Sequence, residues 1–376
     1  MKRIVAAFAI GWVAAITPAL AQTVPDGPPT ARVAPAGHLS ELPVPSGLPR
    51  LTLASPDGSA IHIFPSLNLA SRFSRLGGDY FGGTPPLIYH AGGPIMPTVT
   101  IYNIFWIPAH LQDGSATTLS KAYRTLMNRL AADYPANGIA NNSTQYYQQI
   151  NSTTTYIRNV GGFGGTFVDT SPYPASGCTD TATPNNCITD KQIQAHIKKV
   201  VKARGWSGGL TNIFVLYTSS GEGSCFDSTN ASCAYTDYCA YHGNIAGATP
   251  IIYANIPYGT TNNCQLGGIP SPNNFPEADA ATTAASHEIT ESVTDPLLNA
   301  WYTSDGFEIG DLCAYDYGAS DVGTFNTWDS GNANQMWNGH FYEVQTEFDN
   351  HAYAVAGSGC VQVGPYSLPP STNANP

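Results

Sequence analysis

The stretch "PEADAATTAASHEITESVTDP", residues 276–296, decides the fold prediction. Pro276 suits the first turn of a helix, and Glu277 and Asp279 follow it near the positive end of the helix dipole. The alanine-rich middle favours a helix, which must end before Pro296. The stretch therefore predicts one long helix that carries several ionisable side chains.

Three of those side chains are arranged as a metal site would need them. His287 and Glu291 are four residues apart, so they lie one above the other on the same helix face, and Glu288 points about 100° away. Two ligands and a carboxylate beside the open coordination position are what a metal-bound water requires. We therefore predict His287 and Glu291 as metal ligands and Glu288 as the general base.

The motif departs from the zinc-protease helix, which reads H-E-x-x-H, because Glu291 stands where the second histidine would be. A carboxylate is a harder ligand than imidazole, so the change lowers the preference for zinc and raises that for calcium, manganese or magnesium. We expect a divalent metal, with zinc as the first expectation and calcium or manganese as alternatives.

More acids follow the helix in "LLNAWYTSDGFEIGDLCAY", a turn that contains Asp305, Glu308 and Asp311. In thermolysin-like zinc proteases a glutamate after the helix is the third ligand, and a nearby acid orients a metal-bound histidine. Glu308 and Asp311 stand in the order that suits those two roles. Glu308 is thus a predicted ligand, and Asp311 a fourth ligand or an orienting residue.

His242, in "CAYHGN", is a further candidate ligand. If the next strand borders the helix, His242 completes the ligand set; otherwise it is a loop histidine held by a disulfide at Cys239. Glu222, in "SSGEGSC", has a weaker claim of the same kind. The histidines read as isolated or simply packed are His90, His110, His196, His340 and His351.

Three interpretations of the acidic cluster stay open: a functional metal or acid-base site, a structural ion site, and a solvated helix face without a site. Only 11% of the residues are charged. Five carboxylates around one histidine are unusual in such a chain, and clustered ionisable groups favour a functional site.

The start of the chain, "MKRIVAAFAIGWVAAITPALA", has the layout of a secretory signal: Lys2 and Arg3, an apolar run, then small residues around position 21. We predict that residues 1–21 are a signal peptide. No later run is long and apolar enough to span a membrane, so we expect no membrane association after signal removal.

Residues 22–86 are rich in proline, glycine and alanine. Such a segment buries too little apolar surface to offset its ordering entropy, so it is predicted to be an arm or linker. The folded part, 87–376, is predicted to be a single mixed α/β domain. Its expected strands are 98–108, 212–218 and 249–258, and its expected further helices are 118–134, capped by Thr117 or Thr118, and 189–205, ended by Gly205.

Eight cysteines in an exported chain indicate up to four disulfides, and none has zinc-ribbon spacing. Cys178 with Cys187, and Cys313 with Cys360, are pairings suggested by position. The net charge is −11, whereas a nucleic-acid-binding surface needs an excess of clustered Lys and Arg. Nucleic acid is therefore not an expected partner.

Four segments resemble, in order, the exordium-like, phosphate-induced secreted proteins and their microbial relatives. They are "IYHAGGPIMPTVTIYNIFW", "NIFVLYTSSGEGSC" with "CAYHG", "HEITESVTDPLLNAWYTSDGFEIGDLCA" and "WNGHFYEVQTEFDN". The resemblance implies an extracellular, periplasmic or cell-wall location, but it brings no settled activity. The strand order that leads into "HEITE" also resembles the zincin fold, in which an edge strand holds an extended peptide above the active helix.

These observations predict an α+β fold, zincin-like and disulfide-stapled, with a mixed sheet and packed helices. The predicted function is that of a secreted metal-dependent hydrolase, a peptidase that uses a metal-bound water and a glutamate base on an extracellular peptide or protein. The alternative is a non-catalytic, exordium-like extracellular binding or cell-wall-associated protein in which the same cluster is a structural ion site.

Overall fold

The structure is a computed structural model, and it describes residues 33–34, 50–73, 83–259, 263–264, 271–317, 327–328 and 331–362. Every structural statement below concerns these residues. The predicted signal peptide lies outside them.

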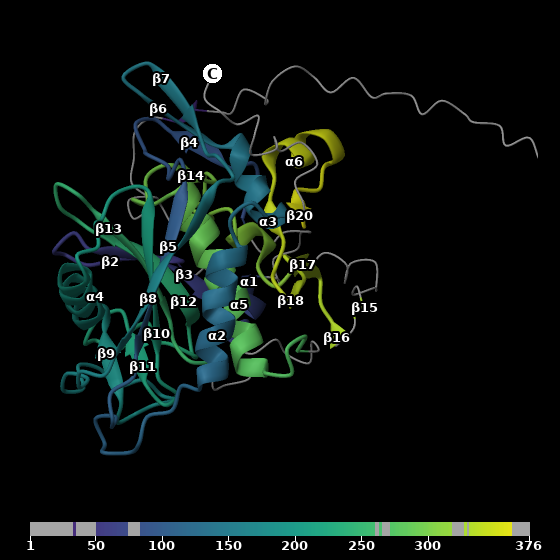
Figure 1. The fold of residues 1–376 in the computed structure, drawn as a ribbon. Helices are drawn as coiled ribbons and strands as arrows, with labels where there is room; N and C mark the ends of the chain where they lie inside the picture. Colours follow the sequence, from purple (N-terminus) through teal and green to yellow (C-terminus); the bar gives the residue numbers. More distant parts are fainter. Residues whose placement is uncertain are drawn as a thin grey trace, which may run out of the picture. The chain divides into compact units, whose positions relative to one another are not determined.

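A seven-stranded mixed sheet organises the fold (Figure 1). The four strands β13, β10, β5 and β8 run parallel, while β12, β3 and β2 continue the sheet in antiparallel fashion beyond β13. In spatial order the strands are β2 (Thr52–Ala54), β3 (Ala60–Pro65), β12 (Tyr238–Ile245), β13 (Ile251–Ile256), β10 (Asn212–Thr218), β5 (Val99–Trp106) and β8 (Gly161–Asp169).

Helices cover both faces of this sheet. Figure 1 shows α5 (Pro276–Thr294) and α2 (Lys121–Asp133) on one face and α4 (Asp190–Arg204) on the other. The shorter helices are α1 (Leu67–Phe73), α3 (Gly138–Asn141), α6 (Asn350–Ala356) and the 3₁₀ turns η3 (Asn142–Gln145) and η4 (Asp311–Cys313). No helix in these ranges is long and apolar enough to cross a membrane.

Small strand pairs complete the domain. One three-stranded sheet joins β1 (Val33–Ala34), β4 (Ile88–His90) and β14 (Trp301–Tyr302). The two-stranded pairs are β6 (Tyr147–Ile150) with β7 (Thr153–Tyr156), β9 (Cys187–Thr189) with β11 (Gly223–Cys225), β15 (Thr327–Trp328) with β16 (Gly331–Asn332), β17 (Gln335–Trp337) with β18 (His340–Tyr342), and β19 (Glu347–Phe348) with β20 (Cys360–Val361). Helices and a mixed sheet confirm the predicted α+β class.

The predicted strands and helices are present with small shifts at their ends. Helix α4 begins at a capping box formed by Thr189 and Gln192, and Gly205 ends it with a φ of 66°, as the sequence indicated. The cap of α2 differs from the prediction. Ser120, rather than Thr117 or Thr118, accepts the hydrogen bond from the Tyr123 backbone at 3.0 Å, so the helix starts at Lys121.

The predicted boundary between arm and domain is wrong for residues 50–73. Strands β2 and β3 belong to the main sheet, and all six residues of β3 are buried. The composition of the whole segment concealed the strand "AIHIFP", whose backbone hydrogen bonds are supplied by β12, more than 170 positions later in the chain. Sheet pairing therefore orders a piece that composition alone assigns to a linker.

Helix α5 is buried along nearly its whole length, from Ala278 to Thr294. Its alanines allow close packing on the sheet, and full burial of Ile289 contributes about 2 kcal/mol. The helix ends at Asp295, whose Oδ1 accepts hydrogen bonds from the backbone of Asn299 at 2.6 Å and Ala300 at 2.7 Å. The predicted helix is confirmed, and its ionisable residues lie inside the protein.

Four disulfides tie the loops together, and the two pairings suggested by position are confirmed. The bonds join Cys178 to Cys187, Cys225 to Cys233, Cys239 to Cys264 and Cys313 to Cys360. Disulfides of this number are typical of proteins that fold in an oxidising compartment, as a secreted chain would.

Candidate metal centre

The three helix residues predicted for the site lie together at the centre of α5. The Nε2 of His287 is 3.1 Å from Oε1 of Glu291, one turn further along the same face. Glu288 lies on the neighbouring face towards β12. All three side chains are fully buried, which excludes the interpretation of this stretch as a solvated helix face.

His242 reaches the helix from β12. Side chains alternate along a strand, so Tyr241 points to α4, where its hydroxyl bonds Asp190 at 3.0 Å, and His242 points to α5. The Nδ1 of His242 lies 3.1 Å from Oε2 of Glu288 and 3.5 Å from Oε2 of Glu291. The sequence left His242 open between a site residue and a loop histidine, and the structure places it in the cluster.

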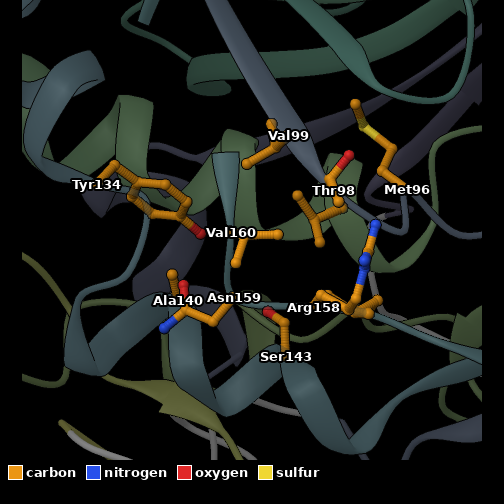
Figure 2. A pocket seen from close by; sticks show the side chains of 11 residues that line it. Met96, Thr98, Val99, Tyr134, Ala140, Ser143, Arg158, Asn159 and Val160 are labelled. Carbon is orange, nitrogen blue, oxygen red and sulfur yellow. The ribbon is translucent and has the colours of Figure 1, made fainter. Parts of the chain in front are cut away.

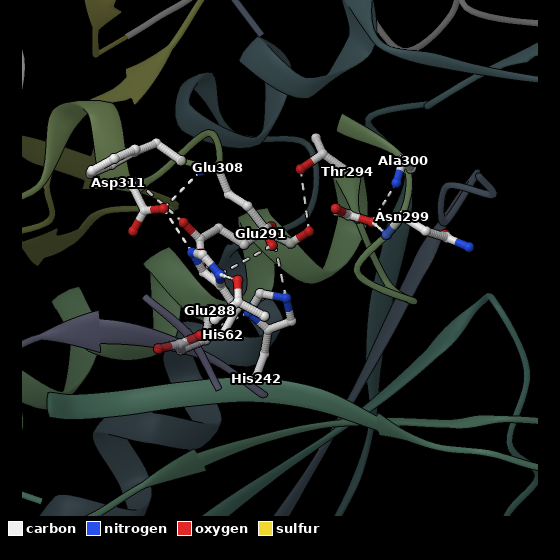
Figure 3. A network of polar contacts seen from close by, with 12 residues as sticks. His62, His242, Glu288, Glu291, Thr294, Asn299, Ala300, Glu308 and Asp311 are labelled. Carbon is white, nitrogen blue, oxygen red and sulfur yellow. Dashed lines mark hydrogen bonds and ion pairs between the residues drawn. The ribbon is translucent and has the colours of Figure 1, made fainter. Parts of the chain in front are cut away.

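Glu308 and Asp311 enter from the turn after the helix (Figure 3). Oδ2 of Asp311 accepts the backbone N–H of Glu308 at 2.7 Å, and the backbone N–H of Asp311 lies 3.2 Å from Oε1 of Glu291. Oε2 of Glu308 is 3.7 Å from Nε2 of His242. Five acids and histidines predicted from separate stretches, together with His242, therefore share one buried cluster.

Gly310 explains how this turn comes so close to the helix. A Cβ atom at this position would lie 2.5 Å from Nδ1 of His287 and 3.0 Å from Oε1 of Glu291. The first distance is too short and the second is tight, so a side chain at position 310 would displace His287 and Glu291, and glycine leaves room for the turn beside them.

His62 is the member of the cluster that sequence analysis missed. It lies on β3, directly across from His242 in the antiparallel register. Its Nε2 is 2.7 Å from Oδ2 of Asp311, and its Nδ1 is 2.8 Å from Oγ1 of Thr52. The alternation Ile61-His62-Ile63 was the available signal, because it places one polar side chain on the opposite face from two apolar ones.

Gln345 is a second residue that the sequence did not single out. Its Nε2 lies 2.8 Å from the carbonyl oxygen of Gly310, to which it donates, and 3.0 Å from Nδ1 of His287. Gln345 thereby fixes the ring of His287 relative to the turn. Nearby Glu347 is also fully buried, and neither of its oxygens has a hydrogen-bond partner among the described residues.

Burial and neighbouring charges shift the pKa values of the carboxyl groups in this cluster in opposite directions. Burial and the neighbouring Glu291 raise the pKa of Glu288 well above its usual range. Burial also raises the pKa of Glu308, with Asp295 as the next cause. Burial acts in the same direction on Glu291, but the adjacent His287 and His242 outweigh it and hold that pKa below the usual range.

The other histidines lie outside the cluster. The ring of His196 stacks on Trp106 at 3.4 Å between centroids, His90 stacks on Tyr302, and His340 bonds Asp133 at 2.6 Å. Glu222, the weaker acidic candidate, accepts a hydrogen bond from Gln112 at 2.8 Å in another part of the domain. These residues, including Glu222, which the sequence offered as a weaker ligand candidate, are packed or hydrogen-bonded outside the candidate metal centre.

Two hollows in the described part of the chain lie apart from the cluster. One, between Tyr134, Arg158 and Val160, has a volume of about 10 Å³, which is room for a single water molecule (Figure 2). The other is an open cleft of about 370 Å³ at the start of α4, lined by residues that include Asp57, Lys191 and Phe226. Neither includes a residue of the candidate metal centre.

Comparison with known proteins gives one partial similarity. Over 76 residues, which are 19% of this chain and 20% of the relative, the chain is 36% identical to "Protein EXORDIUM-like 3" of Arabidopsis thaliana. The chain therefore matches about a fifth of the length of that curated relative. No family model matches, and no solved structure matches.

Proposed function

We propose that the protein is a secreted, metal-dependent hydrolase of the peptidase type. His287, Glu291 and Glu308 hold a divalent ion, with His242 as a fourth ligand. Glu288 is the general base, and Asp311 orients Glu308. The partial similarity to an exordium-like protein and the four disulfides support an extracellular location and a place among the microbial relatives of that family.

The observation that carries the proposal is a set of fully buried polar atoms that have no hydrogen-bond partner among the described residues. They include Nε2 of His287 and of His242, Oε2 of Glu291 and both oxygens of Glu308. Native proteins leave few buried polar atoms unpaired, because each costs about 1–3 kcal/mol. A cation in this cluster would satisfy several of these atoms, and two sets of residues, His242 with Glu288 and Glu291, and His62 with Glu291 and Asp311, bring their ligand atoms within 4.8 Å of one another.

Charge points the same way. Glu288, Glu291, Glu308 and Asp311 are fully buried, and no lysine or arginine in the described ranges forms an ion pair with any of them. Their charge partners among these residues are the imidazoles of His62, His242 and His287, so four buried carboxylates face at most three positive charges, and an uncompensated buried carboxylate is strongly disfavoured. The mixed imidazole and carboxylate set suits zinc or manganese, while calcium favours oxygen ligands alone.

The positions of the side chains suit different roles for the base and for the residues that position the ligands. Glu288 contacts His242 through Oε2 and leaves Oε1 without a partner, so Oε1 is the atom that would take the proton from an attacking water and return it to the leaving amine. Asp311 holds the backbone of Glu308, and Gln345 holds the ring of His287. A bound divalent ion would acidify the water and polarise the scissile carbonyl.

Metal analysis of the purified protein tests the proposal. We expect about one zinc or manganese ion per chain in the wild type and its loss in His287→Ala. A chain without a transition metal, together with unchanged properties of His287→Ala, would remove the metal centre from consideration.

Replacement of Glu288 by glutamine distinguishes the role of general base from the role of metal ligand. Glu288→Gln should retain the metal and the melting temperature, because the amide keeps the shape of the side chain. Its peptidase activity should fall by about a hundredfold to ten-thousandfold, because the amide accepts no proton. The matched comparison is His287→Ala, which should lose both metal and activity.

A non-catalytic, exordium-like protein with a structural ion is the second candidate, and one observation favours it. Every residue of the cluster is fully buried, and a hydrolase must admit its substrate. If the wild type binds metal but cleaves no denatured protein, and Glu288→Gln has no effect other than on stability, this second function is the correct one.

A further inference from the structure

We propose that the outer edge of β12 is a binding site for an extended peptide, and that β3 is a built-in occupant of that site. An external peptide then binds only when β3 leaves. The inference rests on the proposed peptidase function, which it deepens by naming the substrate class, the binding edge and the means of control.

The sheet order gives the first argument. Strand β12 is bonded to β13 on one side and to β3 on the other. Strands β12, β13, β10, β5 and β8 form a continuous sheet without β2 and β3, so removal of the N-terminal hairpin would leave β12 as an edge strand. An exposed edge strand next to a catalytic helix is a place where an extended peptide binds through its backbone.

The second argument is the position of the side chains of β3. His62 and Phe64 are two residues apart and point to the same face, towards α5. His62 contacts Asp311 at 2.7 Å, and the ring of Phe64 lies 4.4 Å from the ring of His287, between centroids. This strand therefore covers the predicted ligands on the side that faces β12.

The third argument is that the predicted site is buried where β3 covers it. All residues of β3 are buried, as are His287, Glu288 and Glu308 beneath and beside it. A peptidase of this geometry must open, and β3 is the element that covers these residues.

The sequence of β3 indicates which peptides would bind in its place. The sequence of β3 is "AIHIFP", an apolar extended segment with one imidazole. Backbone N–H and C=O groups of a bound peptide would pair with β12 in antiparallel fashion, and two alternate side chains would face His287 and Asp311. The expected substrates are unfolded or extended peptides with apolar and aromatic residues at those two positions.

Hydrogen exchange on the wild-type protein is the first test. If β3 opens as a unit, its amides should exchange through an opening of lower free energy than the amides of β13 and β10. Exchange of β3 only together with β13 and β10, in global unfolding, would overturn the inference without the need for any variant.

Peptide binding is the second test. A fluorescent peptide with the sequence of residues 59–66 is added to the wild type and to the full-length double variant His62→Ala/Phe64→Ala, which weakens the built-in contacts. We expect at least tenfold tighter binding to the variant. A control peptide with alanine in place of His62 and Phe64 should bind neither protein. Equal binding of the two peptides, or no binding to a variant whose circular dichroism matches the wild type, would overturn the inference.

The same proteins distinguish this inference from the proposed function. Cleavage of a denatured protein should be at least tenfold faster with the double variant and should be inhibited by the peptide. Peptide binding without cleavage would leave the binding edge in place and contradict the peptidase. If the wild type cleaves at the rate of the double variant, the proposed peptidase function stands and the proposed role of β3 as occupant is contradicted.

Discussion

Single residues in this protein show how strongly burial changes an ionisable side chain. Glu222 is fully buried, Gln112 donates to its Oε1, and its Oε2 has no partner among the described residues. Burial raises the pKa of Glu222 to about 8, and the hydrogen bond from Gln112 opposes that rise only in part. The side chain is thus protonated in the folded protein at neutral pH and ionised in the unfolded chain.

This difference predicts a pH-dependent stability. Between the ordinary glutamate pKa of 4.5 and the folded value of about 8, the folded state holds a proton that the unfolded state lacks. The free energy of unfolding should therefore fall as pH rises, by up to about 1.4 kcal/mol per pH unit from this group. Urea unfolding of Glu222→Gln between pH 5 and 8 should show a shallower fall than the wild type. Asp57→Asn, in an exposed turn, is the control, and equal slopes in all three proteins would refute the prediction.

Local sequence patterns located most members of the buried cluster, although they did not define its full extent. Five candidates came from local patterns, because His287, Glu288 and Glu291 are related by helix spacing and Glu308 and Asp311 follow in the next turn. His62 and Gln345 could not be found in that way. His62 reaches the cluster through strand pairing and Gln345 through a loop, and no local periodicity records either contact.

At the level of elements, the sequence signals were reliable where local chemistry decides the structure. The C-terminal end of α4 was predicted because a terminal glycine acts on adjacent backbone groups. The role of β3 was missed because a strand becomes ordered only through its partner, and that partner is remote in sequence.

The cap of α4 gives a test at this level. The Thr189 side chain accepts from the backbone of Gln192, and the Gln192 side chain accepts from the backbone of Thr189 at 2.8 Å. Thr189→Ala removes one of these bonds and should lower the free energy of unfolding by about 0.5–2 kcal/mol. Lys191→Ala, a change to an exposed side chain in the same turn, should have almost no effect in the same urea titration. Similar losses in both variants would show that the cap contributes nothing specific.

At the level of the whole molecule, the proposed ion would connect parts of the chain that otherwise meet only through packing. The helix α5, the strand β12 and the turn that contains Glu308 each contribute side chains to one point. An ion bound there stabilises the folded state alone, because the unfolded chain does not assemble the ligands.

Removal of the metal should therefore lower the melting temperature. Binding at a free ion concentration a hundred times the Kd stabilises by about 2.7 kcal/mol, which for a domain of this size corresponds to a shift of roughly 4 °C. Differential scanning calorimetry with and without a chelator measures the shift. His287→Ala should melt at the same temperature in both conditions. A wild type that is insensitive to the chelator would show that no stabilising ion is bound.

The contact between His62 and Asp311 joins positions 249 residues apart. During synthesis, the first of these side chains leaves the ribosome long before the second exists, and the strand that carries it can pair with β2 but lacks its other neighbour until β12 has also emerged. An incomplete chain therefore lacks the whole centre, with neither its turn nor its helix in place. If the proposed ion binds an exported chain, it would therefore be acquired late, after disulfide formation, from the metal available outside the cytoplasm.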